Sequence, residues 1–349
     1  MTARRRRPRG VTLVELLIAM AIGVTIVIGT LQMLAAGRDA RRVAERIARL
    51  QEQARSAFAT IEPDVELAGF YGFTQAAETI RLIHGGSPSS VVASALVLRQ
   101  FPLSPGDPPP AAVAGLPTGA HACGVNFAVD VSMPVQASNN AFALGRSPTA
   151  CNAYQGRAQT GADTLTVRRA ATQPGAAESN RLQIYAVRET SRSAQFMFSD
   201  GAAPGPIDDD HEVHDLLVRT YYVARDSVGQ RDFPALRVKA LTRSGTGLVF
   251  DEDEVMSGVE DLQVQFGVSP DGSGRVTHYV EPDSTELPGA QIVSVRVWLR
   301  LRADEAEPSF VDTQTYRYAD VEFTPSGREQ HFRRVLMSRT MTLRNARST

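Results

Sequence analysis

The chain has 349 residues, of which 43% are hydrophobic, so it is long enough to bury the core of one large domain or two small ones. Its formal charge is −1, but five arginines, at positions 4 to 7 and 9, lie within the first ten residues, so the rest of the chain carries −6 (−1 minus 5). A modestly acidic body lacks the basic patch or stripe that nucleic-acid binding requires, and no nucleic-acid partner is expected.

Residues 11–36 form an apolar run with a single charge, Glu15. As a helix the run would measure about 39 Å at roughly 1.5 Å per residue, which exceeds the hydrocarbon core of a bilayer, about 30 Å. A secretory signal peptide has a shorter apolar stretch, about 7–15 residues, that ends in a small-residue cleavage site. This run is longer and continues into Gly37, Arg38 and Asp39, so it predicts a retained membrane anchor.

Glu15 is unusual in such a segment. A charged side chain at the centre of a membrane helix costs about 2.5–3.5 kcal/mol on insertion scales, so Glu15 is expected to have a partner. Snorkelling of the side chain at the start of the helix is one explanation. Cleavage after Gly10 is another, because it would make Glu15 the fifth residue of the product and bring its carboxylate close to a new, positively charged amino group.

The sequence RGVTLVELLIAMAIG at residues 9–23 resembles the class III signal of type IV prepilins and pseudopilins. The resemblance implies that a prepilin peptidase cuts after Gly10 and methylates the new first residue, Val11. It also implies that Glu15 serves methylation and docks each subunit onto its neighbour in a filament. The usual first mature residue in these proteins is Phe, and Val11 departs from that pattern.

A helix is expected to continue beyond the anchor. Apolar residues recur at spacings of three and four, and charged residues fill the opposite face. This stripe comprises Val43, Ile47, Leu50, Ala54, Phe58 and Ile61. Pro63 disfavours helix at the residue before it, so the helix is predicted to end or kink there. The expected domains are a leader peptide at 1–10, a transmembrane and filament-core helix at 11–62, and a periplasmic β-rich head at 63–349.

Cys123 and Cys151 are the two cysteines, 28 positions apart, with neither a CxxC motif nor paired histidines nearby. In an oxidising compartment they predict a disulfide, which would stabilise the fold by about 3–4 kcal/mol on the chain-entropy model. Two separate buried thiols are the structural alternative, and a metal or redox pair is the functional one.

Strand-like runs replace the helical period beyond Pro63. In the clearest run, residues 293–302, valines and leucines alternate with polar and aromatic residues. Similar runs occur at residues 163–169, 182–188, 216–224, 235–241, 259–268 and 339–344. Together they predict an α+β fold, in which a mainly antiparallel sheet packs on the second half of the long helix. The proline-rich residues 102–117 are predicted to form an exposed loop.

Five segments of the head occur in an order that resembles the PilW family of type IV pilus minor pilins: residues 67–72, 163–168, 221–223, 258–264 and 340–345. The resemblance implies a type IV pilin-like fold and a low-abundance subunit that helps to start pilus assembly and can remain at the tip. The implied partners are the prepilin peptidase, other minor pilins and the major pilin, the inner-membrane assembly platform and a tip-associated adhesin-type protein. Twitching motility is the implied process.

Charge alone does not orient the membrane span. Five arginines precede it and five follow it, at positions 38, 41, 42, 46 and 49, so the positive-inside rule gives a tie. The resemblance implies a single-pass inner-membrane protein whose head lies in the periplasm before assembly and in the pilus afterwards. The cysteine pair agrees with a head outside the cytoplasm.

The other clusters of polar residues are predicted to be loops and turns and not metal or catalytic sites. Residues 208–215, DDDHEVHD, favour a solvated acidic loop over a metal site, and residues 269–274 favour a hairpin turn over a calcium loop because Asp271 is their only acid. The only lysine, Lys239, lies between Val238 and Ala240, which excludes a P-loop, and there is no GxSxG motif. No catalysis, cofactor or metal is expected.

Two other classes of function remain open. A pseudopilin of a type II secretion system would share residues 10–62 and differ in the head. A signal-anchored periplasmic enzyme or binding protein would keep residues 1–10 and never enter a filament.

Overall fold

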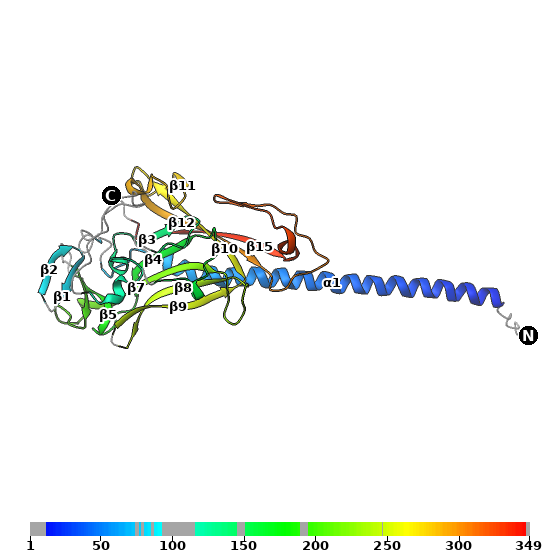
Figure 1. The fold of residues 1–349 in the computed structure, drawn as a ribbon, viewed down its shortest axis with the longest axis horizontal. Coiled ribbons are helices and arrows are strands. Elements are labelled where there is room, and N and C mark those ends of the chain that lie inside the picture. Colours follow the sequence, from blue (N-terminus) through cyan, green and yellow to red (C-terminus); the bar gives the residue numbers. More distant parts are fainter. Residues whose placement is uncertain are drawn as a thin grey trace, which may run out of the picture. The chain divides into compact units, whose positions relative to one another are not determined.

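The computed structural model describes residues 12–73, 77, 80–84, 87–92, 116–144, 151–188, 195–245 and 247–346. The chain divides into two compact units, Met1–Arg49 and Leu50–Thr349. One long helix, α1 (Leu13–Glu66), contributes to both units, and β-strands make up most of the second unit (Figure 1).

In the first unit, α1 begins with an apolar, exposed segment. Its segment Leu13–Leu34 has a mean hydropathy of 2.3 and no buried residue. The polar groups of this segment are satisfied inside the helix, since the hydroxyl of Thr25 donates to the carbonyl of Ile22 over 2.8 Å and that of Thr30 to Val27 over 2.9 Å. By length and composition the segment can cross a membrane, as the sequence predicted.

In the second unit, α1 buries the predicted apolar stripe. Leu50, Ala54, Phe58 and Ile61 are each at most 3% exposed. They belong to one hydrophobic core with inward-facing side chains of both large sheets. Complete burial of each Leu, Ile or Phe contributes about 1.5–3 kcal/mol, so this stripe is a main attachment of the helix to the strands.

The predicted end of the helix at residue 62 is wrong, because α1 continues through Pro63 to Glu66. In the last turn a proline removes one backbone donor, and the carbonyl of Pro63 still accepts the N–H of Leu67 over 3.2 Å. The additional turn carries Asp64 and Val65 into the interior, where they are 1% and 0% exposed. Tertiary contacts there outweigh the local preference against helix before proline.

The first sheet has nine strands, and the long strand β7 (His211–Ala224) lies at its centre. Strand β5 pairs with the first part of β7, whereas β4 and β8 pair with its second part. All pairings are antiparallel except that of β1 with β6. The other strands are β1 (Ile80–His84), β2 (Ser87–Val92), β3 (Val135–Ser138), β4 (Thr164–Ala170), β5 (Ser179–Val187), β6 (Gln195–Asp200), β8 (Ala235–Ser244) and β9 (Gly247–Ser257).

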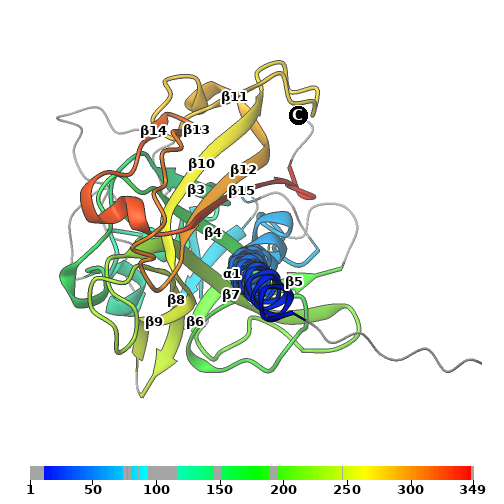
Figure 2. The same ribbon diagram turned by 90° about the vertical axis from the view of Figure 1, so that its right-hand side faces the viewer.

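The second sheet is antiparallel, in the order β11-β10-β12-β15. Figure 2 shows β10, β12 and β15 running side by side. Its strands are β10 (Val259–Ser269), β11 (His278–Val280), β12 (Gln291–Arg302) and β15 (Arg334–Thr342), and a small sheet is formed by β13 (Tyr316–Tyr318) and β14 (Val321–Phe323). Short 3₁₀ helices complete the described fold: η3 (Thr118–His121), η4 (Phe127–Val129), η5 (Tyr154–Gly156), η6 (Leu287–Gly289) and η7 (Gly327–His331).

One face of β12 packs on the apolar core as its alternation predicted, but its polar face is also largely covered. Arg300 is 6% exposed and Arg334 is 9% exposed, and both pair with Glu260, over 2.6 and 2.7 Å. The hydroxyl of Tyr318 on β13 contacts Arg300 and Asp261. The segment between β12 and β15 therefore lies on the outer side of the sheet and is held there by buried charges.

The α+β prediction is confirmed by the helix and the two antiparallel sheets. Each of the seven predicted runs overlaps an observed strand: β4, β5, β7, β8, β10, β12 and β15. The sequence missed the remaining strands, most of which are short or at sheet edges. Most of the proline-rich loop predicted at 102–117 lies outside the described residues, which resume at 116.

Candidate functional site

Glu15 closes a capping box at the start of α1. The backbone N–H of Thr12 donates to Oε2 of Glu15 over 3.0 Å, and the Thr12 hydroxyl donates to the same oxygen over 3.2 Å. The Glu15 N–H in turn donates to Oγ1 of Thr12 over 3.3 Å. The carboxylate therefore satisfies backbone groups at the positive end of the helix dipole.

Sequence reasoning missed Thr12 as a partner of Glu15, although the spacing T-x-x-E is the signature of this motif. Both contacts from Thr12 to the carboxylate use Oε2. The predicted cleavage and methylation residues, Gly10 and Val11, lie outside the described residues.

The last turn of α1 carries a second polar centre, built around Asp64. Its carboxylate accepts hydrogen bonds from Arg169 on β4 (2.8 Å), from Arg219 on β7 (3.0 Å) and from the hydroxyl of Tyr221 on β7 (2.6 Å). A buried carboxylate requires such compensation, because an unpaired charge in the interior is strongly destabilising. This cluster fixes the helix end to the first sheet, and no pattern along the chain identifies it beyond the residue types.

Strand β15 and the residues that follow it hold the same end of the helix from the second sheet. The N–H of Arg344 donates to the carbonyl of Glu66 over 3.0 Å, and the two side chains form an ion pair. Arg339 pairs with Glu62 over 3.2 Å. These two pairs are at the surface, so each contributes about 0–1 kcal/mol, and the Asp64 cluster is the stronger attachment.

Cys123 and Cys151, the pair expected from the sequence, are joined in a disulfide. Cys123 is 2% exposed and belongs to the second hydrophobic core, which also contains Phe127 and Leu182. The bridge therefore joins two points of the irregular stretch before β4, and both cysteines pack in or against this core.

The acidic stretch at 208–215 is only partly the loop that was predicted. Strand β7 begins at His211, and His214 is 2% exposed. His214 Nδ1 lies 2.8 Å from the carbonyl of Ala171, and its Nε2 lies 3.1 Å from Glu212. Alternation along a strand places His211 and His214 on opposite faces, so the two imidazoles do not face one site.

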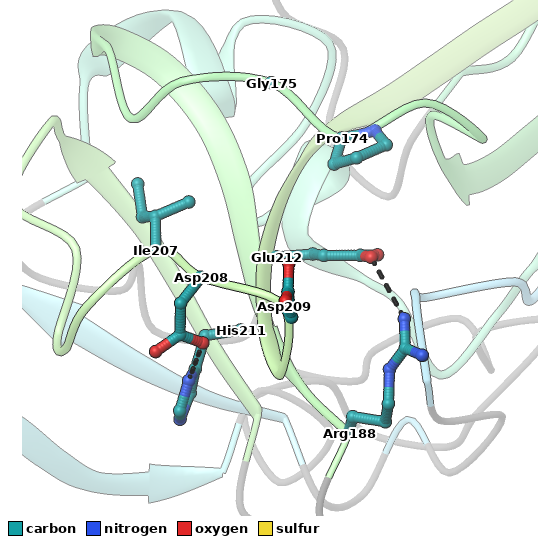
Figure 3. Close-up of a pocket in the computed structure, with 8 residues that line it drawn as sticks. All are labelled: Pro174, Gly175, Arg188, Ile207, Asp208, Asp209, His211 and Glu212. Atoms are coloured by element: carbon teal, nitrogen blue, oxygen red, sulfur yellow. Dashed lines mark hydrogen bonds and ion pairs between the residues drawn. The ribbon is translucent and has the colours of Figure 1, made fainter.

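An open pocket of 460 Å³ lies beside this stretch. Figure 3 shows two pairs among its charged groups: Asp208 with His211 over 2.6 Å and Arg188 with Glu212 over 3.4 Å. The hydrogen bond from His211, followed by that from the Asp210 N–H, lowers the pKa of Asp208. Within the described residues no group of three or more His, Cys, Asp or Glu side chains could hold a metal ion.

The stretch at 269–274 is the predicted turn. It leaves β10, and β11 then returns antiparallel to β10. Asp271 Oδ1 accepts hydrogen bonds from the Ser269 hydroxyl (2.9 Å) and the Ser273 N–H (3.1 Å). The single carboxylate therefore serves the turn itself.

Two family models match the chain. Residues 220–345 match the type IV pilus-assembly protein W family, and residues 5–31 match the prokaryotic N-terminal methylation motif. No curated protein sequence matches the chain. Among solved structures, a type IV-like pilin from Thermus thermophilus is similar at 13% identity and a TM-score of 0.27, over 53% of this chain and 79% of that one. At this identity and TM-score the similarity supports no statement about function.

Proposed function

We propose that the chain is a type IV pilus minor pilin of the PilW family, and that its first helix anchors it in the inner membrane, with the head in the periplasm, until it enters the pilus. The observation that carries the proposal is the exposed apolar segment Leu13–Leu34, which has Glu15 as its single charge and overlaps the matched methylation motif at residues 5–31. A helix with so much exposed apolar surface needs lipid or the apolar helices of other subunits around it.

Glu15 has the chemistry for a second partner. Its Oε2 is occupied by Thr12, which keeps the carboxylate at the start of the helix. Cleavage after Gly10 would create a positively charged amino group at Val11, and a neighbouring subunit's amino group would compensate the Glu15 charge in an apolar surrounding. The sequence order Gly10-Val11-Thr12 and the matched motif support cleavage by the prepilin peptidase with methylation of Val11.

We propose a structural role in pilus assembly, with no catalysis. The Asp64 cluster and the buried stripe give the helix end a fixed attachment to the head, as a subunit needs if force on the helix is to reach the head. The proposed partners are the other minor pilins, the major pilin, the inner-membrane assembly platform and a tip-associated protein, and twitching motility is the process served.

The decisive measurement is the intact mass and N-terminal sequence of the protein from its own membranes, with and without the prepilin peptidase. An N-terminus at methylated Val11 that depends on the peptidase is expected. Retention of residues 1–10 in both strains would overturn the proposal. Deletion of the gene is expected to reduce surface pili and twitching, whereas lost protein export with intact pili would identify a secretion machine instead.

A further inference from the structure

Arginines line one face of α1 directly after its apolar segment. Arg38, Arg42, Arg46 and Arg49 recur at intervals of three or four residues, and Arg41 lies beside them. On an α-helix this spacing places side chains on one face. Residues 38–49 carry these five arginines against two acids, Asp39 and Glu45, so the segment is basic although the chain body is acidic.

The arginines differ in their distance from the apolar segment, which ends at Leu34. At about 1.5 Å per residue, Arg38 to Arg42 lie roughly 6–12 Å beyond Leu34, and Arg46 and Arg49 lie roughly 18–22 Å beyond it. The headgroup layer of each leaflet is roughly 5–8 Å thick, and charges are screened over about 8 Å at physiological ionic strength. For a helix that spans the bilayer upright, Arg38 lies within the headgroup layer. Arg41 and Arg42 lie beyond it but within one screening length, whereas Arg46 and Arg49 lie farther away than one screening length.

We propose that Arg38, Arg41 and Arg42 bind the phosphates of anionic phospholipids while the subunit is anchored in the membrane. All three side chains are exposed. Guanidinium groups bind phosphate oxygens in pairs, and their aliphatic stems can lie along the lipid while the charge stays in the headgroup layer. We choose lipid as the partner because the basic face begins four residues after a segment that is long and apolar enough to lie in a bilayer.

This inference rests on the proposed anchored state and extends it. Each arginine near an anionic membrane surface strengthens the binding of anionic lipid roughly fivefold, and the acidic residues of the segment reduce this gain. Acidic side chains of a neighbouring subunit are the competing partner for the same face, and the experiment separates the two.

The test uses the processed full-length chain, beginning at Val11, so that the leader arginines are absent. It is reconstituted into phosphatidylcholine vesicles with trace spin-labelled phosphatidylglycerol or phosphatidylcholine, and electron paramagnetic resonance measures the fraction of each label held at the protein. We expect severalfold preference for phosphatidylglycerol, decreasing at high salt. The variant R41Q/R42Q should lose most of the preference, while the matched control R46Q/R49Q, which removes the same charge farther out, should keep it.

Equal association of the two labels with the wild-type chain would overturn the inference, as would an equal loss in both variants. Lack of lipid preference combined with poor entry of R41Q/R42Q into pili would assign the arginines to a neighbouring subunit instead. Flotation with the vesicles is measured in parallel. A chain that does not float would overturn the anchored function and this inference with it, whereas flotation without preference would overturn this inference alone.

Discussion

Tyr221 donates its hydroxyl hydrogen to Oδ2 of Asp64 over 2.6 Å and so connects the last turn of α1 to the middle of the first sheet. Burial and the adjacent Asp64 carboxylate raise the pKa of Tyr221, so the hydroxyl remains a donor throughout the neutral range. Arg169 and Arg219 complete the cluster from two neighbouring strands. The helix end is thus held by one carboxylate with three donors.

Replacing Asp64 is expected to destabilise the head strongly. Asp64→Asn leaves the buried Arg169 without its counter-charge, for which we expect a loss of about 3–5 kcal/mol. Tyr221→Phe removes one hydrogen bond to a charged group, for an expected loss of about 1.5–3 kcal/mol. Urea unfolding of the full-length protein in detergent measures both. The exposed Asp253→Asn is the control, and an Asp64→Asn protein as stable as that control would show that the cluster does not hold the helix.

Asp163 should make stability depend on pH. It is 1% exposed, and burial raises its pKa to about 8, against the lowering effect of the Asn140 and Val264 N–H groups. Because folded Asp163 holds its proton more tightly than the unfolded residue, with an ordinary pKa of 3.8, its contribution is fully present below that value and is lost as the pH rises to about 8.

The expected slope from Asp163 is up to about 1.4 kcal/mol per pH unit between these limits. Thermal unfolding from pH 5 to pH 8 should therefore show a steeper decline for the wild type than for Asp163→Asn. Glu252, whose pKa burial raises to about 7, adds a slope of the same sign to both proteins, so the comparison between them isolates Asp163. If the stability of the two proteins declined equally with pH, the raised pKa of Asp163 would be contradicted.

Loss of the disulfide should destabilise the second unit without changing its secondary structure. The bridge joins residues 28 positions apart, and the chain-entropy model gives about 3–4 kcal/mol for a loop of that length. The double variant Cys123→Ser/Cys151→Ser should show this loss in urea unfolding. Alkylation with and without prior reduction counts the thiols by mass, and labelling of unreduced protein from its own membranes would contradict a bridge there.

Glu15 should matter for entry into the pilus more than for cleavage. Glu15→Ala is expected to leave removal of residues 1–10 largely intact and to reduce the pilus-associated protein sharply, because the docking charge is gone. Thr12→Val removes the hydroxyl of the capping box, worth about 1 kcal/mol, and should have a milder effect. Immunoblots of sheared pili measure both, with Thr25→Val as the control; wild-type amounts of Glu15→Ala would reject the docking role.

Periodic features could be predicted because they depend on neighbouring residues alone. The stripe from Leu50 to Ile61 and the alternation along β12 follow from the geometry of one helix and one strand. The end of α1 could not be predicted in this way, since the local effect of Pro63 opposes helix and the burial of Asp64 and Val65 favours it. Strands such as β3 and β11 were missed because four or three residues are too few to show a period.

The sequence by itself determined the apolar helix with its single carboxylate and the α+β class, because these depend on composition and short-range spacing. Only the tertiary structure decided which charges are buried together. Asp64 meets Arg169 and Arg219 across 105 and 155 residues of chain, and Glu260 meets Arg334 across 74. Such pairs form when strand order and register bring distant residues to one place, and the pattern along the chain carries no period that would identify them.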